Sequence, residues 1–188
     1  MHPGKCSLAG SKAEFLGHVI SAEGISPDPA KTEAVRNFPV PTGVKGVRQF
    51  LGMASYYRRF IKSFAKIASP LHALTRQDVP FCWTSTCQNS FQLLKDALVS
   101  PPVLAYPNFG KPFVLHTDAS GEGLGAVLEQ EQDDNRLHPV AYASRSLNKH
   151  ERNYSITDME ALAVVWAAKH FRAYLYGHQC VVLSLIHI

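Results

Sequence analysis

A short stretch at residues 113–130, FVLHTDASGEGLGAVLEQ, places an acidic residue at the end of a strand-like run. Residues Phe113 to Thr117 predict a strand, in which successive side chains alternate between the two faces, so Asp118 follows on the same face as His116. The glycines that follow permit a tight turn and close backbone approach: Gly121, Gly123 and Gly125. Asp118 is therefore a candidate metal ligand, and an aspartate that only caps a turn is the common alternative.

A second acidic residue, Glu160, lies near the start of the apolar segment SITDMEALAVVWAAKHFRAYL at residues 155–175. This segment predicts a helix that is apolar nearly all round, so we expect it to be buried on a sheet. Thr157 with Glu160 fits a capping box, and Ser155 with Asp158 fits one equally well. In the second register Glu160 faces away from the cap and lies near the sheet, where a carboxylate needs a partner. Glu160 is therefore the second candidate metal ligand.

Basic residues gather in the first half of the chain. The protein has 188 residues and a formal net charge of +4, yet residues 31–76 hold nine Lys or Arg and one acid, a net of +8. Residues 111–177 hold seven basic and nine acidic residues, a net of −2. This asymmetry suits a nucleic-acid-binding surface beside a metal site. Basic helices that only face the solvent would give the same pattern.

Within the basic segment, SYYRRFIKSFAK at residues 55–66 interleaves tyrosines with cations. Such side chains contact phosphates, sugars and bases in nucleic-acid complexes. The predicted nucleic-acid-binding residues are Arg48, Tyr57, Arg58, Arg59, Lys62 and Lys66. An alternative interpretation makes Tyr56, Phe60 and Phe64 a buried stripe at i, i+4 and i+8 with the cations outside, and the two interpretations are compatible.

Composition argues against several other classes of protein. The longest uninterrupted apolar run, at residues 161–168, is too short to span a bilayer, so we expect no membrane partner. The N-terminal segment lacks the apolar core of a secretory signal, and the scattered cysteines and histidines form no zinc-binding spacing. We therefore expect an intracellular protein, with cytoplasm and nucleus not distinguished, and reduced thiols.

Proline positions divide the first half into helices. Asp28 and Pro29 predict a helix start, as N-cap and first helical residue. Residues 44–74 predict two helices, of which the second carries Phe60, Phe64 and Ile67 and is limited by Pro70. The first of these helices is expected to bury Val47, Phe50, Leu51 and Ala54. A further helix is expected over residues 88–99.

The second half changes to strands. Runs at residues 113–117, 124–128 and 138–144 predict an antiparallel meander, followed by the apolar helix and a fourth strand from Cys180 to Leu183. The order is β-β-β-α-β. The chain is therefore expected to be α+β in class.

Several long segments of the sequence resemble a known protein family. FVLHTDASGEGLGAVLEQ, HPVAYASRSL and ERNYSITDMEALAVVWAAKHFRAYLYG resemble the ribonuclease H domain of Ty3/gypsy-type retrotransposon polyproteins. FLGHVISAEGISPDPAKTEAV, VRQFLGMASYYRRFIKSFAKIASPLHALT and FCWTSTCQNSFQLLKDAL resemble the segment just upstream, the end of the reverse transcriptase with its thumb and connection. The resemblance runs in order and without gaps over about residues 5–183. The sequence is identified as a fragment of such a Pol polyprotein.

The resemblance implies a division of the chain into five parts. Residues 1–23 would end the reverse transcriptase palm, 24–100 would form thumb and connection helices, and 101–112 would be a proline-rich linker. Residues 113–183 would be a partial, truncated RNase H-like domain, and residues 184–188 a non-native tail. In the family, the fourth strand continues into a Thr-Asp-His motif, whereas this sequence has Ser184-Leu185-Ile186 at the corresponding positions. LSLIHI can be encoded by the end of a common sequencing-library adapter, and a genuine frameshift in a decayed element is the alternative.

The resemblance also implies a chemistry. Asp118 and Glu160 would be the first two of four carboxylates that bind two Mg²⁺ (or Mn²⁺) ions in the intact parent and cleave the RNA strand of an RNA–DNA hybrid. The sequence has no Tyr-x-Asp-Asp motif of a polymerase, and its only pair of adjacent aspartates, Asp133-Asp134, lies in a polar turn. We therefore expect the polymerase carboxylates to lie upstream of Met1, which would then be an internal methionine.

The expected parent is an RNA-directed DNA polymerase with RNase H activity. As written, the chain is expected to catalyse neither reaction, because it lacks the polymerase acids and at least two of the four nuclease acids. Expected partners are an RNA–DNA hybrid or template–primer duplex and the remainder of the Pol polyprotein, with the oligomeric state left open. The alternative function is a non-catalytic, retroelement-derived nucleic-acid-binding module.

Overall fold

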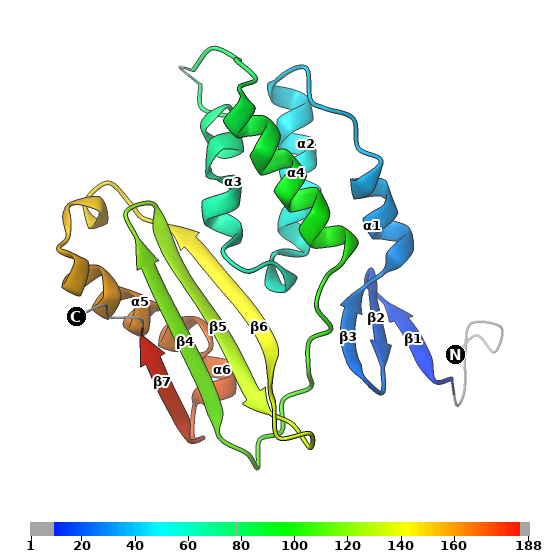
Figure 1. Cartoon of the computed structure of the whole chain (residues 1–188), viewed down its shortest axis with the longest axis vertical. Coiled ribbons are helices and arrows are strands. Elements are labelled where there is room, and N and C mark those ends of the chain that lie inside the picture. Colours follow the sequence, from blue (N-terminus) through cyan, green and yellow to red (C-terminus); the bar gives the residue numbers. More distant parts are fainter. Residues whose placement is uncertain (1–9, 78, 185–188) are drawn as a thin grey trace.

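A helical lobe and a sheet lobe lie side by side in the computed structural model, which describes residues 10–77 and 79–184 (Figure 1). A small antiparallel sheet precedes the helices, with strands β1 (Lys12–Phe15), β2 (His18–Ser21) and β3 (Gly24–Pro27). The predicted α+β class is confirmed. None of the helices in the described ranges has the length and apolar character needed to cross a bilayer.

The described residues of the helical lobe contain four helices and one 3-10 turn. These are α1 (Pro29–Arg36), α2 (Val44–Tyr56), η2 (Arg58–Phe60), α3 (Phe64–Ala73) and α4 (Ser85–Val99). Asp28 caps α1 as predicted, since its side chain accepts a hydrogen bond from the Ala30 N–H at 2.8 Å. The predicted apolar face of α2 is also buried in the lobe's core: Val47, Phe50, Leu51 and Ala54.

Two predictions for the segment from Tyr56 to Pro70 are wrong. Pro70 lies inside α3 and does not limit it, because the helix is held on the core by Phe64, Ala68 and Leu71, all buried. Tyr56 is 53% exposed and Tyr57 only 5% exposed, so the expected stripe of Tyr56, Phe60 and Phe64 does not form. The helix breaks after Tyr56 and resumes at Phe64, which interrupts the i, i+4 spacing on which that stripe depended.

The sheet lobe has four strands in the order β6-β5-β4-β7. The strands are β4 (Phe113–Ser120), β5 (Gly123–Glu131), β6 (Leu137–Ser146) and β7 (Cys180–Ser184). β4, β5 and β6 form the predicted antiparallel meander, and β7 pairs parallel to β4. The connection from β6 to β7 contains the turn η3 (Glu151–Asn153) and the helices α5 (Ile156–His170) and α6 (Arg172–Leu175). The predicted β-β-β-α-β order is therefore confirmed.

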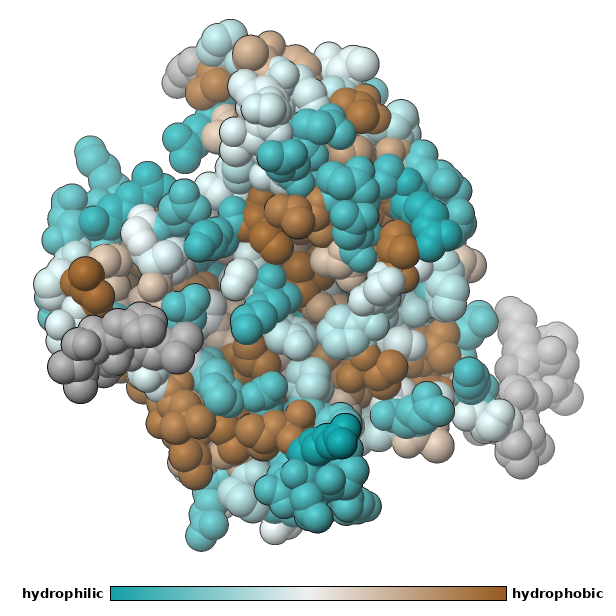
Figure 2. All heavy atoms as spheres, in the orientation of Figure 1, coloured by the Kyte–Doolittle hydropathy of each residue, from teal (hydrophilic) through white to brown (hydrophobic). Residues whose placement is uncertain are grey.

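Helix α5 covers one face of the sheet but is not buried all round. Ala163 and Ala167 face the sheet and are fully buried, whereas Ile156 is 77% exposed and Val165 is 51% exposed on the outer side. The helix packs on the sheet as expected, and its outer side is exposed because the described residues place a sheet on only one of its sides. Strand β7 also carries exposed apolar residues: Val181, Val182 and Leu183. Figure 2 shows apolar atoms on the surface over this strand.

The extended segment at residues 101–112 bonds to both sheets. Leu104 forms a two-way backbone bridge with Ile25, at 2.8 and 2.9 Å, and the Ala105 N–H donates to the Pro139 carbonyl at 2.8 Å. The buried Gln130 side chain accepts from the Asn108 N–H and donates to the Asn108 carbonyl, both at 2.7 Å. These bonds attach the segment to β3 on one side and to β5 and β6 on the other.

Candidate metal-binding and nucleic-acid-binding site

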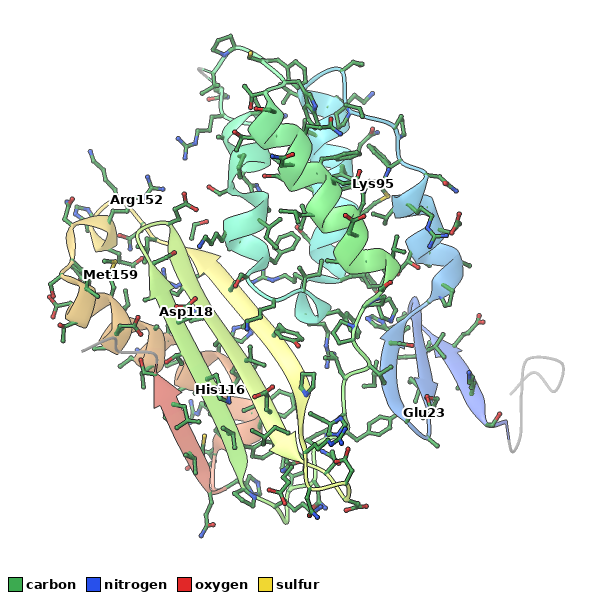
Figure 3. All side chains as sticks on the ribbon, viewed as in Figure 1. Glu23, Lys95, His116, Asp118, Arg152 and Met159 are labelled. Atoms are coloured by element: carbon green, nitrogen blue, oxygen red, sulfur yellow. The ribbon has the colours of Figure 1, made fainter. Side chains whose placement is uncertain are left out.

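Asp118 lies exposed near the end of β4, on the face of the sheet opposite α5. Burial alternates along the strand as predicted, with Phe113, Leu115 and Thr117 buried on the α5 side. Figure 3 shows Asp118 and His116 following one another along β4. Asp118 is paired with Gly125 of β5, which has no side chain to cover it. Among the described residues, Asp118 forms no ion pair within 4.0 Å, so its carboxylate is open to a ligand.

Two adjoining hollows separate Asp118 from the helical lobe. The larger has a volume of about 280 Å³ and is lined by Lys62 and Ser63 on one side and by β4, β5 and Tyr142 on the other. The smaller is lined by Ser63 and Lys66 and by the β4–β5 turn. Asp118 lines both hollows. The structure thus brings two of the predicted nucleic-acid-binding lysines to the predicted metal ligand.

Glu160 lies in the first turns of α5 and is directed at the sheet. Ser155 is the N-cap, because its Oγ accepts from the Asp158 N–H at 3.1 Å and donates to the Asp158 carboxylate at 2.7 Å. The Ser155 register is therefore the one that forms, and it leaves Glu160 free of the cap. Glu160 is 5% exposed and accepts a hydrogen bond from the Ser184 hydroxyl at 2.8 Å.

The two acids reach the same end of β4 from opposite faces. Ser184, the partner of Glu160, is paired in the sheet with Thr117, the residue next to Asp118. Thr117 is 1% exposed, and its Oγ1 has no hydrogen-bond partner in the described structure. Glu160, Ser184 and Thr117 therefore form a buried polar cluster directly behind the strand position that carries Asp118.

The donor set suits a hard divalent cation in type, because both candidate ligands are carboxylates. Within residues 10–77 and 79–184, however, no group of three or more His, Cys, Asp or Glu side chains lies close enough to hold a metal ion. The position of Leu185, where the resemblance puts a third acid, lies outside the described residues, as does the rest of the predicted tail after Ser184. The described chain therefore supplies two candidate ligands.

The other predicted nucleic-acid-binding residues are engaged within the protein. Tyr57 is buried and its hydroxyl donates to the Gly17 carbonyl at 3.1 Å, so its ring is not on the surface. Burial, and then the charges of Tyr56 and Asp28, raise the pKa of Tyr57 above its ordinary value. The guanidinium groups donate to backbone carbonyls, Arg48 to Thr75 and Arg58 to Ser144, each at 3.1 Å. Arg59 is half-buried with its guanidinium 5.7 Å from the Phe60 ring centroid.

Sequence reasoning missed several residues that build this site. His116 and Glu129 face the larger hollow with the His116 Nε2 2.9 Å from the Glu129 Oε2, at an angle that makes no hydrogen bond. Tyr142 lines the same hollow, and burial followed by the Glu129 charge raises its pKa. The alternation along β4 places His116 on this face. Its approach to Glu129 depends on the register set by the β4–β5 turn.

Comparison with known proteins identifies the chain's relatives. The family described as the RNase H-like domain found in reverse transcriptase matches residues 83–182. The chain is 45% identical over 177 residues to the retrovirus-related Pol polyprotein from transposon 412 and 46% identical over 184 residues to that from transposon opus, both of Drosophila melanogaster. It is 40% identical over 171 residues to the transposon Tf2-3 polyprotein of Schizosaccharomyces pombe.

These alignments cover 94%, 92% and 91% of this chain, respectively, but only 14%, 18% and 13% of the polyproteins. RNase H-like domains generally use divalent metal ions. The predicted resemblance to Ty3/gypsy-type Pol polyproteins is confirmed.

Solved structures support the fold. The foamy viral protease-reverse transcriptase in complex with an RNA/DNA hybrid has a TM-score of 0.80 at 22% identity, over 97% of this chain and 25% of that one. The same viral protein in complex with double-stranded DNA has a TM-score of 0.78 at 22% identity, over 95% of this chain and 37% of that one. Since the matched family covers more than half of the sequence, the chain belongs to the RNase H-like domains found in reverse transcriptase.

Proposed function

We propose that this chain is a segment of a retrotransposon Pol polyprotein whose whole length is an RNA-directed DNA polymerase with RNase H activity. In that protein Asp118 and Glu160 hold divalent cations, with two Mg²⁺ or Mn²⁺ ions in the complete site. The observation that carries this proposal is the convergence of both acids on one end of β4. Asp118 is exposed there without an ion pair, and Glu160 is buried with a single hydroxyl partner.

Each acid has a distinct part in this proposal. When bound, the metal ions supply a nucleophilic water and stabilise the leaving oxygen in an in-line displacement. Asp118 presents its carboxylate to the open side of the sheet, toward the larger hollow, which has room for a substrate phosphate. Glu160 is buried on the α5 side of the sheet, and in this chain its carboxylate accepts a hydrogen bond from the Ser184 hydroxyl, at the position where the family has a threonine.

The parts of the chain follow from the same proposal. Residues 1–23 end the palm, 24–100 are thumb and connection, 101–112 join the connection to the RNase H-like part, and 113–183 begin that part. Residues 184–188 are a non-native tail. The substrate is an RNA–DNA hybrid or a template–primer duplex, the remainder of the polyprotein is the partner, and the protein acts inside the cell.

The basic residues hold the nucleic-acid backbone. Lys62 and Lys66 are exposed at the hollows, and just before them in the chain lie Arg58, which is exposed although it donates to the Ser144 carbonyl, and the half-buried Arg59. If about four cations contact phosphates, the logarithm of the binding constant should fall with the logarithm of the salt concentration with a slope of roughly −3 to −4. Fluorescence anisotropy with a labelled hybrid measures this slope, and a slope near zero would contradict phosphate binding.

The experiment that tests the nuclease assignment compares two lengths of protein. A longer Pol segment that includes further acids is expected to cleave the RNA strand of a hybrid in Mg²⁺, and Asp118→Asn or Glu160→Gln is expected to abolish that cleavage. The 188-residue chain alone is expected to bind the hybrid without cleaving it. Cleavage by this chain that Asp118→Asn abolishes would overturn the expectation of inactivity, and full activity of both variants in the longer protein would overturn the site.

A non-catalytic nucleic-acid-binding module is the second candidate. It is favoured by the exposed Lys62 and Lys66 at the hollows beside the sheet, which could bind phosphates without a metal. A transcript that encodes Ser184 to Ile188 and then a stop would support it. A locus in which Leu183 continues in frame into a Thr-Asp-His word would instead support the nuclease.

A further inference from the structure

We propose that the nuclease site is shared between the two lobes, with Lys62 and Lys66 of the helical lobe binding the backbone phosphates that flank the position of Asp118. This inference rests on the proposed function and adds a substrate-positioning role for two residues outside the RNase H-like sheet. The ligand is the phosphodiester backbone of a hybrid strand. The two lysines would place that strand across the end of β4.

The first argument is that each lysine shares a hollow with Asp118. Lys62 lines the larger hollow and Lys66 the smaller, and Asp118 and Ser63 line both. Both lysine residues are exposed, and neither forms an ion pair within 4.0 Å among the described residues. Their charges are therefore available to an anion that enters the larger hollow or lies over the mouth of the smaller one.

The second argument is that the lobes are held in a fixed relation at this point. The Ser144 hydroxyl of β6 accepts from the Ala65 N–H at 2.9 Å, and the Ser144 carbonyl accepts from Arg58 at 3.1 Å. Ser144 itself lines the smaller hollow. The segment that carries Lys62 and Lys66 is thus bonded to the sheet on both sides of Ser63, through the Arg58 side chain and the Ala65 N–H, so both lysines extend from a fixed base beside Asp118's end of β4.

The third argument is electrostatic. Without metal, a phosphate in the hollows would lie near the Asp118 carboxylate, and two like charges at close range repel. Two lysine ammonium groups on the opposite wall offset that repulsion and favour phosphate binding. The arrangement predicts that the effects of Asp118 and of the lysines on hybrid affinity are coupled, since all three act on one phosphate region.

The test is a double-mutant cycle on the 188-residue chain in metal-free buffer, with hybrid affinity measured by anisotropy. Lys62→Gln and Lys66→Gln should each weaken binding roughly three- to tenfold and reduce the magnitude of the salt slope by about 1. Lys62→Arg and Lys66→Arg should restore affinity. Asp118→Asn should tighten binding, and its effect should differ between the wild type and the Lys62→Gln background by more than about twofold.

Lys45→Gln is the matched control, because Lys45 is an exposed lysine of the same lobe that lines neither hollow. It should change affinity less than twofold, and circular dichroism should show every variant folded. Hybrid binding with equal losses for Lys45→Gln and Lys62→Gln, or with additive effects of Asp118→Asn and Lys62→Gln, would overturn the shared site and leave the proposed function standing. No hybrid binding by the wild type would overturn both.

Discussion

The Ser144 hydroxyl accepts a hydrogen bond from the Ala65 backbone N–H at 2.9 Å and thereby caps helix α3 from a strand of the other lobe. The residue that precedes α3, Ser63, makes no capping bond of its own and has a left-handed backbone conformation at φ 55°. One buried side chain of the sheet therefore completes a helix end in the helical lobe. This is a tertiary substitute for a local N-cap.

Replacing that hydroxyl should weaken the junction between the lobes. Ser144→Ala leaves the Ala65 N–H without its acceptor, so we expect the free energy of unfolding in urea to fall by about 1–2 kcal/mol. Ser146→Ala is the control, because Ser146 is an exposed serine of the same strand. Equal stability of Ser144→Ala and the control would show that the cap does not contribute.

The glycines of the β4–β5 turn should differ sharply in what they tolerate. A Cβ at Gly123 would lie 2.7 Å from the Arg145 carbonyl oxygen of β6, whereas a Cβ at Gly121 would meet nothing within 4 Å. Gly123→Ala should therefore lower the free energy of unfolding by about 1–3 kcal/mol. Gly121→Ala should stay within about 0.5 kcal/mol of the wild type. Thermal unfolding of both variants measures this difference, and equal losses would contradict the contact.

The buried carboxylate of Glu160 should cost stability in the absence of metal. Glu160→Gln removes a charge from a 5% exposed site and keeps an oxygen that accepts from Ser184. We expect the free energy of unfolding in EDTA to be unchanged or higher by up to about 1 kcal/mol. The matched control is Glu122→Gln in the exposed β4–β5 turn. A clear loss of stability for Glu160→Gln alone would assign Glu160 to structure, not to a ligand.

The Arg145–Glu151 pair predicts a pH dependence of stability. Arg145 donates two hydrogen bonds to the Glu151 carboxylate, at 2.7 and 2.9 Å, and Asn148 donates a backbone N–H at 2.8 Å. The bonds from Arg145, and then that from Asn148, lower the pKa of Glu151 below its ordinary value of 4.5 despite some burial. The folded state therefore binds this proton less readily than the unfolded state does.

It follows that the contribution of Glu151 is complete above about pH 4.5 and is lost as the pH falls through the lowered pKa. Glu151→Gln should thus be less stable than the wild type at pH 7. The difference should shrink progressively below pH 4.5. Thermal unfolding at a series of pH values provides the measurement. A difference that does not change with pH would show that the charge of Glu151 has no part in it.

Local signals in the sequence predicted local structure well. Asp28 before Pro29 and the alternation of faces that ends at Asp118 depend on neighbouring residues, and both form as expected. Of the two capping registers that fitted the start of α5 equally well, the Ser155–Asp158 register forms. The face of Asp118 was therefore available from the sequence. Its proximity to Lys62 was not, because it depends on how the two lobes pack.

The predictions that were wrong also depend on tertiary packing. Pro70 remains inside α3 because tertiary burial outweighs one missing backbone hydrogen bond, which no local rule anticipates. Tyr57 is buried in place of Tyr56, because the chain turns after α2 and interrupts the helical period. The Ser144 cap on α3 joins residues 79 positions apart, so periodicity within a short window gives no sign of it.

The bonding of residues 101–112 to both sheets has a consequence for proteases. A proline-rich stretch between two lobes is ordinarily a preferred site for nicking, because proteases need a segment that detaches from its neighbours. Here Leu104, Ala105 and Asn108 are each bonded to a strand by the backbone. Limited digestion should therefore spare this stretch and cut first at the exposed hairpin tip of Asp133 to Arg136. The fragments would then separate within the sheet and not between the lobes.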